Sequence, residues 1–145
     1  MNKSLYLFIQ VTWGILTFLA GLFVTVFIRI FVSSAETRKN GWGLITSFGG
    51  NWGGLSLGPF AFCGRYTVGS SFYEHTRRHE FGHSIQVLFM GPFFIFIVAI
   101  PSAIRYWYYR LTPNNPHKTY DAVWFEGTAT RWGSRWIDKI EKEQA

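Results

Sequence analysis

A run of 24 mostly apolar residues without a charged side chain, from Leu5 to Ile28, limits the folds open to this chain more than any other feature. At about 1.5 Å per residue, a helix of that length would cross the roughly 30 Å hydrocarbon core of a bilayer. We therefore expect residues 1–32 to form a transmembrane anchor. A cleaved signal peptide ending near Ser33-Ser34-Ala35 is the alternative, but the apolar segment of a signal peptide usually has only about 7–15 residues.

The composition favours contact with lipid. Aromatic residues make up 20% of the chain and charged residues only 15%, whereas about a quarter of the residues in a soluble domain are charged. The formal net charge is +6, and the basic residues are scattered rather than gathered in a nucleic-acid-binding motif. We expect the anionic headgroups of a lipid bilayer as a partner, and no nucleic acid. Cys63 is the only cysteine, which excludes an internal disulfide.

Glycines are concentrated between residues 41 and 69, a segment that holds 9 of the 15 glycines. This density favours turns and short strands over helix. The best strand candidate is Leu55–Phe62, and Pro59 would place it at the edge of a sheet because proline cannot donate to a neighbouring strand. A loop folded over the core is the alternative for this segment.

A helix is predicted from Ser71 to about Met90. It begins with a capping box, Ser71-Phe72-Tyr73-Glu74, in which the hydroxyl and the carboxylate each bond a free backbone amide. Gly91-Pro92 ends it, because glycine favours a helix C-terminus and proline cannot continue a helix.

This helix carries the motif His79-Glu80-Phe81-Gly82-His83. Its two histidines are four residues apart and lie on one face, where both imidazoles can bind one zinc ion at about 2.0–2.1 Å. Glu80 is then placed to act on a metal-bound water rather than to bind the metal. An ordinary structural helix is the alternative interpretation.

A catalytic zinc ion needs three protein ligands and an open position for water. His75 precedes His79 by four residues, but three successive helical turns spread the outer two histidines over about 12 Å along the axis. All three cannot reach one ion, so we interpret His75 as a residue of the cleft edge or of the packing.

A second uncharged run extends from Ile85 to Ile104, and its two prolines predict breaks. The aromatic and basic segment 105–110 follows, which suits a membrane interface. Residues 111–118 are predicted to be a loop. A last helix is predicted over residues 119–142. Its apolar face contains Phe125, Ala129, Trp132, Trp136 and Ile140.

The HExxH motif, followed downstream by a helix with Glu126-Gly127-Thr128-Ala129, resembles the gluzincin metallopeptidases (HExxH…ExxA), including membrane-bound relatives of the M48 type. The chain is also similar to a small group of bacterial membrane proteins with H-E-x-G-H, a Gly-Pro stop and an apolar stretch. The resemblance implies zinc bound by His79, His83 and Glu126, with Glu80 as general base. The alternative for Glu126 is a solvated carboxylate on a helix face.

The resemblance departs from the family pattern at Thr130, where an acidic residue often follows E-x-x-A. A carboxylate at that position normally orients a zinc-bound histidine. Glu74 or Asp121 could take over this support. For stabilising an oxyanion, the candidates by polarity and proximity in sequence are His117, Tyr120 and Arg131.

These observations predict a mostly helical α+β chain, with the anchor followed by a membrane-associated metallopeptidase-like domain over residues 33–145. Peptides or membrane proteins would be its substrates, and β-augmentation on an edge strand could hold them. The alternative is a non-catalytic zinc-binding or structural membrane protein with a degenerate HExxH helix. Because His79 and Glu126 must lie on one side of the bilayer, Ile85–Ile104 should form a broken hairpin or a shallow insertion. The flanking positive charges favour, by about one charge, a catalytic domain in the cytoplasm of a bacterial inner membrane.

Overall fold

The fold combines a small sheet with packed helices, and a computed structural model describes residues 1–112 and 123–144 of it. The α-helices of these residues are α1 (Lys3–Thr12), α2 (Ile15–Phe31), α3 (Ser71–Met90), α4 (Ile100–Leu111) and α5 (Trp124–Gln144). The strands are β1 (Glu36–Asn40), β2 (Gly43–Phe48), β3 (Gly54–Leu57) and β4 (Phe60–Gly64). Short 3₁₀ turns η1 (Arg65–Thr67) and η2 (Gly91–Phe93) and the π-helical turn η3 (Ile95–Ala99) complete the described chain. The predicted mostly helical α+β class is confirmed.

The four strands form one mixed sheet in the order β1-β2-β4-β3. The central pair, β2 and β4, is parallel, and the two outer pairs are antiparallel. The prediction of one strand over Leu55–Phe62 is wrong, because Gly58 and Pro59 form the turn of a hairpin between β3 and β4. Gly58 has a φ of 60°, which glycine adopts readily, and Pro59 needs no partner in a turn. Of the two strands in this segment, only β3 lies at an edge of the sheet, and β1 forms the opposite edge.

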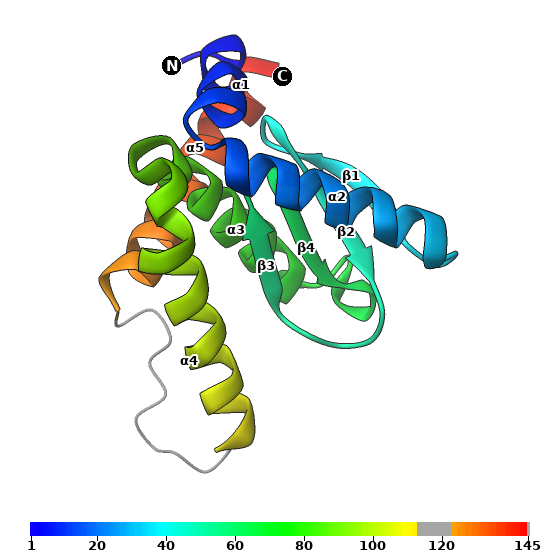
Figure 1. Cartoon of the computed structure of the whole chain (residues 1–145). Coiled ribbons are helices and arrows are strands. Elements are labelled where there is room, and N and C mark those ends of the chain that lie inside the picture. Colours follow the sequence, from blue (N-terminus) through cyan, green and yellow to red (C-terminus); the bar gives the residue numbers. More distant parts are fainter. Residues whose placement is uncertain (113–122, 145) are drawn as a thin grey trace.

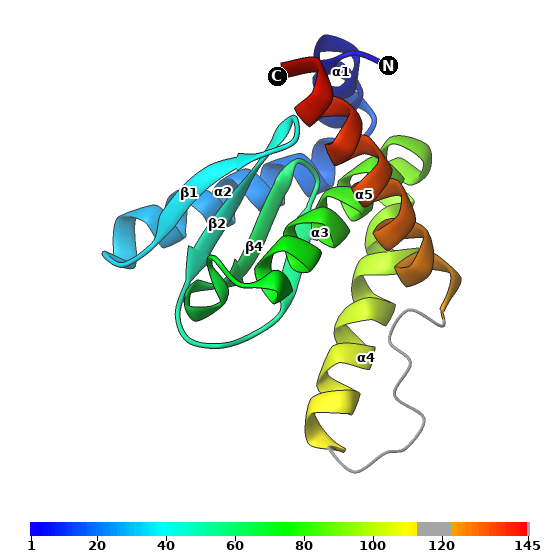
Figure 2. The same ribbon diagram turned by 180° about the vertical axis from the view of Figure 1, so that it is seen from behind.

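Helices cover both faces of the sheet, with α2 on one face and α3 on the other, and α5 packs on the far side of α3 (Figures 1 and 2). The alternation of β4 explains this arrangement. Phe60 and Phe62 join the apolar cluster under α2, whereas Ala61 and Cys63 join the cluster that contains Tyr73 of α3.

The first apolar run forms two helices rather than one. The axes of α1 and α2 are bent by 96° at the break after Thr12, so the prediction of a single helix over this run is wrong. Tertiary contacts fix the bend, because Tyr6 and Gln10 of α1 are buried and donate hydrogen bonds to Ser84 of α3, at 3.0 and 2.9 Å. The transmembrane anchor over residues 1–32 stays a prediction.

The second apolar run breaks at Gly91-Pro92, as predicted, but the predicted break at Pro101 is not found, because Pro101 lies inside the continuous helical segment Ile95–Leu111. The helix α3 ends at Met90, Gly91 has a φ of 51°, and the segments on either side of Phe94 are bent by 117°. Pro101 lies in the first turn of α4, where proline is tolerated. Across residues 1–112 and 123–144, no single helix has both the length and the apolar composition to cross a membrane; two bent pairs, α1 with α2 and α3 with α4, meet both criteria together.

One predicted helix start differs from the structure, and the other lies outside the described residues. The cap of α3 is Ser70 rather than Ser71, since the backbone N–H of Tyr73 donates to the Ser70 hydroxyl at 3.1 Å. The described part of the last helix begins at Trp124, and its predicted start at Thr119 lies outside the described residues. The part of the predicted loop from residue 113 onward lies outside them as well.

Candidate metal centre

The candidate metal centre lies between the helices α3 and α5, whose backbones are in direct contact. A Cβ on Gly82 would lie 1.8 Å from the carbonyl oxygen of Ala129, and a Cβ on Gly133 would lie 1.7 Å from that of Arg78. No side chain larger than hydrogen fits at either glycine. The close approach brings the histidines of α3 within reach of a carboxylate on the first turn of α5.

The structure brings together the three predicted ligands, His79, His83 and Glu126, and all three are buried. Glu126 Oε2 lies 3.0 Å from His79 Nε2 and 3.2 Å from His83 Nε2, and the two Nε2 atoms are 3.1 Å apart. Tetrahedral zinc ligands at about 2.05 Å stand about 3.3 Å apart, close to this spacing. The trio could hold a metal ion. His75 is exposed, its ring centroid 6.1 Å from that of His79, and it is not part of the group.

A glutamine that the sequence analysis did not single out fixes the tautomer of His83. Gln86 Nε2 donates to the carbonyl oxygen of Phe125 at 2.7 Å, so its Oε1 faces His83 Nδ1, at 2.8 Å. A carboxamide oxygen only accepts, and Nδ1 therefore carries the proton. The lone pair of a neutral His83 is left on Nε2, the atom that faces the other two ligands. A polar side chain one turn after His83, within an apolar run, is the signal that could have identified Gln86.

Thr130 supports the other histidine. Its hydroxyl lies 2.8 Å from His79 Nδ1, at the position where the gluzincin pattern often has an acidic residue. The expectation that Glu74 could take this role is wrong, because Glu74 is exposed and forms an ion pair with Arg77 at 2.7 Å. The other candidate, Asp121, lies outside the described residues.

Glu80 lies beside the trio at the interface of α3 and β3. A Cβ on Gly54 would be 2.2 Å from Glu80 Oε1, so glycine in β3 makes room for this carboxylate. Burial raises the pKa of Glu80 above its ordinary value, although His79, His83 and the hydroxyl of Ser56 oppose the rise. Within the described chain, its buried Oε2 has no hydrogen-bond partner.

The donor set fits a divalent cation. Burial alone would raise the pKa of Glu126, but hydrogen bonds from His79 and His83 outweigh burial and hold the pKa below its ordinary value. Burial alone would lower the pKa of His83, but its contact with Glu126 and the nearby charge of Glu80 outweigh burial and raise the pKa. Glu126 Oε1 is also buried without a regular hydrogen bond to any described residue. Two imidazoles and a buried carboxylate with an unbonded oxygen are donors that a divalent metal ion accepts.

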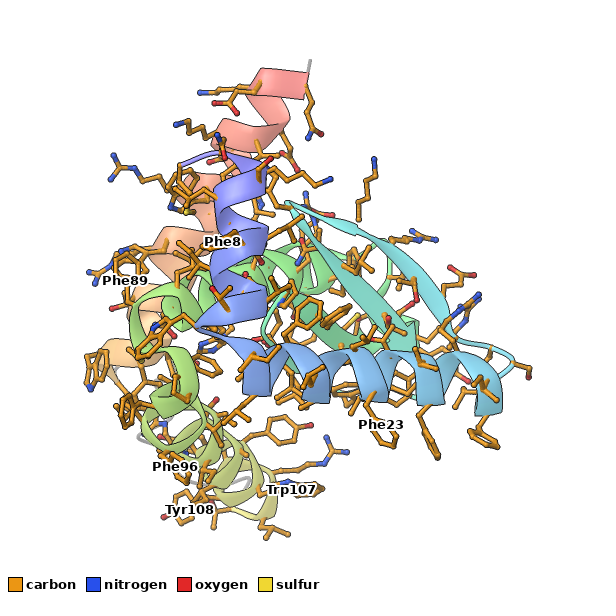
Figure 3. The ribbon with its side chains drawn as sticks, turned by 45° about the horizontal axis from the view of Figure 1, so that its top comes forward. Phe8, Phe23, Phe89, Phe96, Trp107 and Tyr108 are labelled. Carbon is orange, nitrogen blue, oxygen red and sulfur yellow. The ribbon has the colours of Figure 1, made fainter. Side chains whose placement is uncertain are left out.

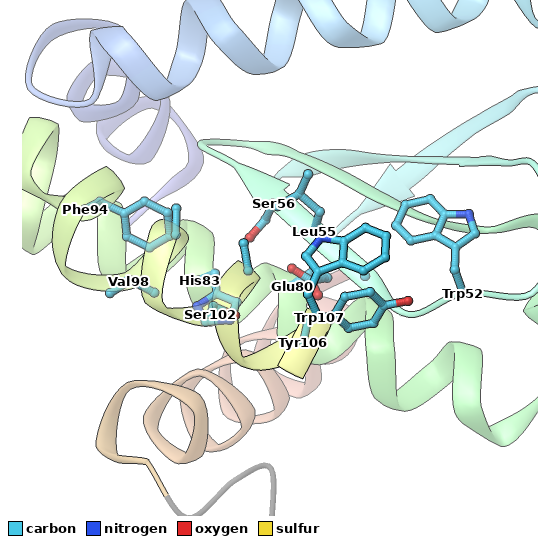
Figure 4. Close-up of a pocket in the computed structure, with 13 residues that line it drawn as sticks. Trp52, Leu55, Ser56, Glu80, His83, Phe94, Val98, Ser102, Tyr106 and Trp107 are labelled. Atoms are coloured by element: carbon cyan, nitrogen blue, oxygen red, sulfur yellow. The ribbon is translucent and has the colours of Figure 1, made fainter. Parts of the chain in front are cut away.

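An apolar pocket of about 230 Å³ opens above Glu80 and His83, between β3 and α4 (Figure 4). A single water needs only about 10–15 Å³ of such space, so the pocket has room for part of an organic substrate. Its wall and rim consist largely of aromatic and apolar side chains, among them Trp52, Leu55, Phe94, Val98, Tyr106 and Trp107. The oxyanion candidate Arg131 is exposed and is not among the pocket residues, and His117 and Tyr120 lie outside the described residues.

The fold and the site thus define a mixed α+β chain with a buried His-His-Glu group between two packed helices. No protein-family model, no curated protein and no solved structure matches the chain. The resemblance to gluzincin metallopeptidases therefore remains a prediction from the two motifs.

Proposed function

We propose that this protein is a membrane-associated zinc metallopeptidase that hydrolyses peptide bonds. One observation carries the proposal: His79, His83 and Glu126 converge with ligand spacing, and Glu80 lies beside them, where it lines an apolar pocket together with His83. A site that only stapled two helices would need the three ligands but neither the pocket nor the extra buried carboxylate.

The residues of the site have separate tasks in the proposed reaction. His79, His83 and Glu126 would hold the zinc ion, which when bound lowers the pKa of water and polarises the scissile carbonyl. Glu80 accepts the proton of the attacking water through a carboxylate oxygen that has no other hydrogen bond in the described chain, and delivers it to the leaving amine.

The membrane part of the proposal is supported by composition and exposure. Large apolar side chains such as Phe23 and Phe96 are exposed by 70% and 68%, and the two bent helix pairs have the length and composition of membrane segments. We propose a bacterial inner membrane, with the site on its cytoplasmic side.

Zinc analysis and hydrolysis, measured on detergent-purified full-length protein, test the proposal. We expect about one zinc ion per chain in the wild type and a large loss of zinc in His83→Ala. Glu80→Gln should keep zinc and lose hydrolysis of a peptide library, because an amide cannot accept the proton. Glu74→Gln, an exposed carboxylate on the same helix, is the matched control and should behave as wild type. Zinc retained in His83→Ala would refute the site, and full activity in Glu80→Gln would refute the general base.

A further inference from the structure

Exposed apolar side chains line the outer sides of α2 and α4, and Phe23, Phe96, Trp107 and Tyr108 all lie on the lower side of the view in Figure 3. The exposed apolar side chains of α2 include Leu16, Leu19, Phe23, Phe27, Ile30 and Phe31. Those of η3 and α4 include Phe96, Ile97, Ile100, Ile104, Trp107 and Tyr108. Such a surface is larger than a soluble monomer usually leaves in water, which indicates that another apolar phase covers it.

The charge pattern around this surface matches a bilayer. The two apolar runs contain no charged residue, and basic residues flank them at Lys3, Arg29, Arg105 and Arg110. Basic side chains at the margin of an apolar face pair with anionic headgroups, and the aromatic rings near the end of α4 suit the interfacial zone.

The packing of α2 fixes how it can meet lipid. One side of the helix is buried along its length, at Thr17, Gly21, Thr25 and Ile28, and it lies on the β3–β4 hairpin. A Cβ on Gly21 would come within 2.4 Å of the carbonyl oxygen of Leu57, so the contact is close. With the sheet against one side and an apolar row on the other, α2 can lie along a bilayer surface but cannot be surrounded by lipid.

The pocket opens on the same surface. Leu55 of β3 and Trp107 of α4 line the pocket, and both are exposed apolar side chains, by 41% and 58%. The pocket wall beside them is the edge strand β3, which has one neighbour in the sheet. An edge strand leaves alternate backbone N–H and C=O groups free to pair with another extended polypeptide. A lipid acyl chain has no groups that could form these hydrogen bonds.

We propose that the α2–α4 surface lies in one leaflet of a bilayer, parallel to the membrane plane, and that the pocket takes an extended apolar polypeptide segment directly from the lipid phase. This inference rests on the proposed function and names its substrate: the apolar segment of a membrane-inserted chain. The segment would run along β3, with a large apolar side chain in the pocket and its backbone beside Glu80.

Depth measurements on full-length protein bound to vesicles of neutral and anionic phospholipid test the orientation. A fluorophore is attached to cysteine variants of Leu16, Phe23 and Ile30, and its quenching by lipids brominated at shallow and deep positions is compared. Cys63 stays unlabelled, because it is fully buried and burial raises its pKa to about 11. A helix in the membrane plane gives the three positions equal, shallow depths. A spanning helix would separate the outer two by about 21 Å and would overturn the proposal.

Peptide binding tests the pocket. Ala103→Trp fills the mouth of the pocket, whereas Ile104→Trp, one residue along and exposed outside the pocket lining, is the matched control. A vesicle-inserted apolar peptide with a photo-crosslinking side chain should label wild type and Ile104→Trp equally and Ala103→Trp at least tenfold less. Zinc content should be the same in all three proteins. Equal labelling of both variants, or displacement of the peptide by free fatty acid alone, would overturn the proposal.

Measuring both binding and hydrolysis distinguishes a failure of the proposed peptidase activity from a failure of the proposed substrate. If the peptide labels the pocket as expected but wild type cleaves it no faster than Glu80→Gln does, the proposed function fails and the substrate site stands. If soluble peptides are cleaved but the membrane-inserted peptide neither labels the pocket nor is cleaved, the further inference fails and the peptidase stands.

Discussion

The hydroxyl of Thr130 should control how tightly the site holds zinc. When His79 binds a metal through Nε2, its Nδ1 must carry a proton, and the Thr130 hydroxyl lies in place to accept it, at 2.8 Å. Thr130→Val keeps the shape of the side chain and removes that acceptor. The metal-free protein can respond by changing the tautomer of His79, but the metal-bound protein cannot.

The magnitude follows from the unsatisfied donor. A partly buried N–H left without an acceptor costs about 1–3 kcal/mol, and each 1.4 kcal/mol changes a dissociation constant tenfold. We therefore expect Thr130→Val to bind zinc about 10- to 100-fold more weakly, the range usual for residues that orient a ligand histidine. Competition with a chromophoric zinc chelator measures the change.

Two further variants make this test specific. Thr130→Ser restores the hydroxyl and should bind zinc within a fewfold of wild type. Thr128→Val removes a hydroxyl on the same helix that donates to the backbone carbonyl of Trp124 rather than to the centre, and it should leave zinc affinity unchanged. If Thr130→Val binds zinc as tightly as Thr128→Val does, the assigned role of the hydroxyl is wrong.

Three other predictions concern the support of the centre. Gly133→Ala should lower the free energy of unfolding by about 3 kcal/mol or more, because its Cβ would meet a backbone oxygen at 1.7 Å; Gly50→Ala, with no atom within 4 Å of its Cβ, is the control in denaturant titrations. Gln86→Leu should lower the free energy of unfolding by about 2 kcal/mol or more, because His83 Nδ1 and the carbonyl oxygen of Phe125 both lose their buried hydrogen-bond partner. It should also weaken zinc binding, and a zinc affinity equal to wild type would contradict the role of Gln86. In metal-free protein, the stability that ionised Glu126 contributes to the fold should be lost as the pH falls below the ordinary pKa of 4.5 towards the lowered pKa of the folded state. The stability that protonated His83 contributes should be lost as the pH rises above 6.5 and through its raised pKa. The melting temperature should therefore be highest between these two pH ranges, and a melting temperature that does not change with pH would refute the coupling of Glu126 and His83.

Local patterns in the sequence were sufficient for α3 and its motif. The spacing of His79 and His83 depends only on helical geometry, and Gly91-Pro92 stops a helix wherever it occurs. The third ligand came from the resemblance to a known family, since nothing in the sequence near Glu126 says which helix it will face. The structure brings all three ligands together.

Tertiary contacts decided the features that the sequence did not reveal. The absence of charge between Leu5 and Ile28 indicates an apolar segment but does not say whether its helix is straight or bent. The bend after Thr12 follows from the burial of Tyr6 and Gln10 against α3. The strand β1 is polar and charged, Glu-Thr-Arg-Lys-Asn, and its pairing with β2 leaves no alternating pattern to detect. The hairpin turn at Gly58-Pro59 was mistaken for part of a strand because apolar residues flank it on both sides.

The glycine inside the histidine motif shows that steric fit matters in this centre as much as ligand chemistry. Two imidazoles on one helix can meet a carboxylate on another only if the two backbones approach closely, and Gly82 makes that approach possible. Ala129 and Gly133 follow Glu126 by three and seven residues, so the side of α5 that carries the carboxylate continues as a row of small residues against α3. A larger side chain in this row would push Glu126 away from the histidines even with every ligand intact. We therefore expect the spacing of these small residues to indicate a three-ligand site more reliably than the glutamate does alone.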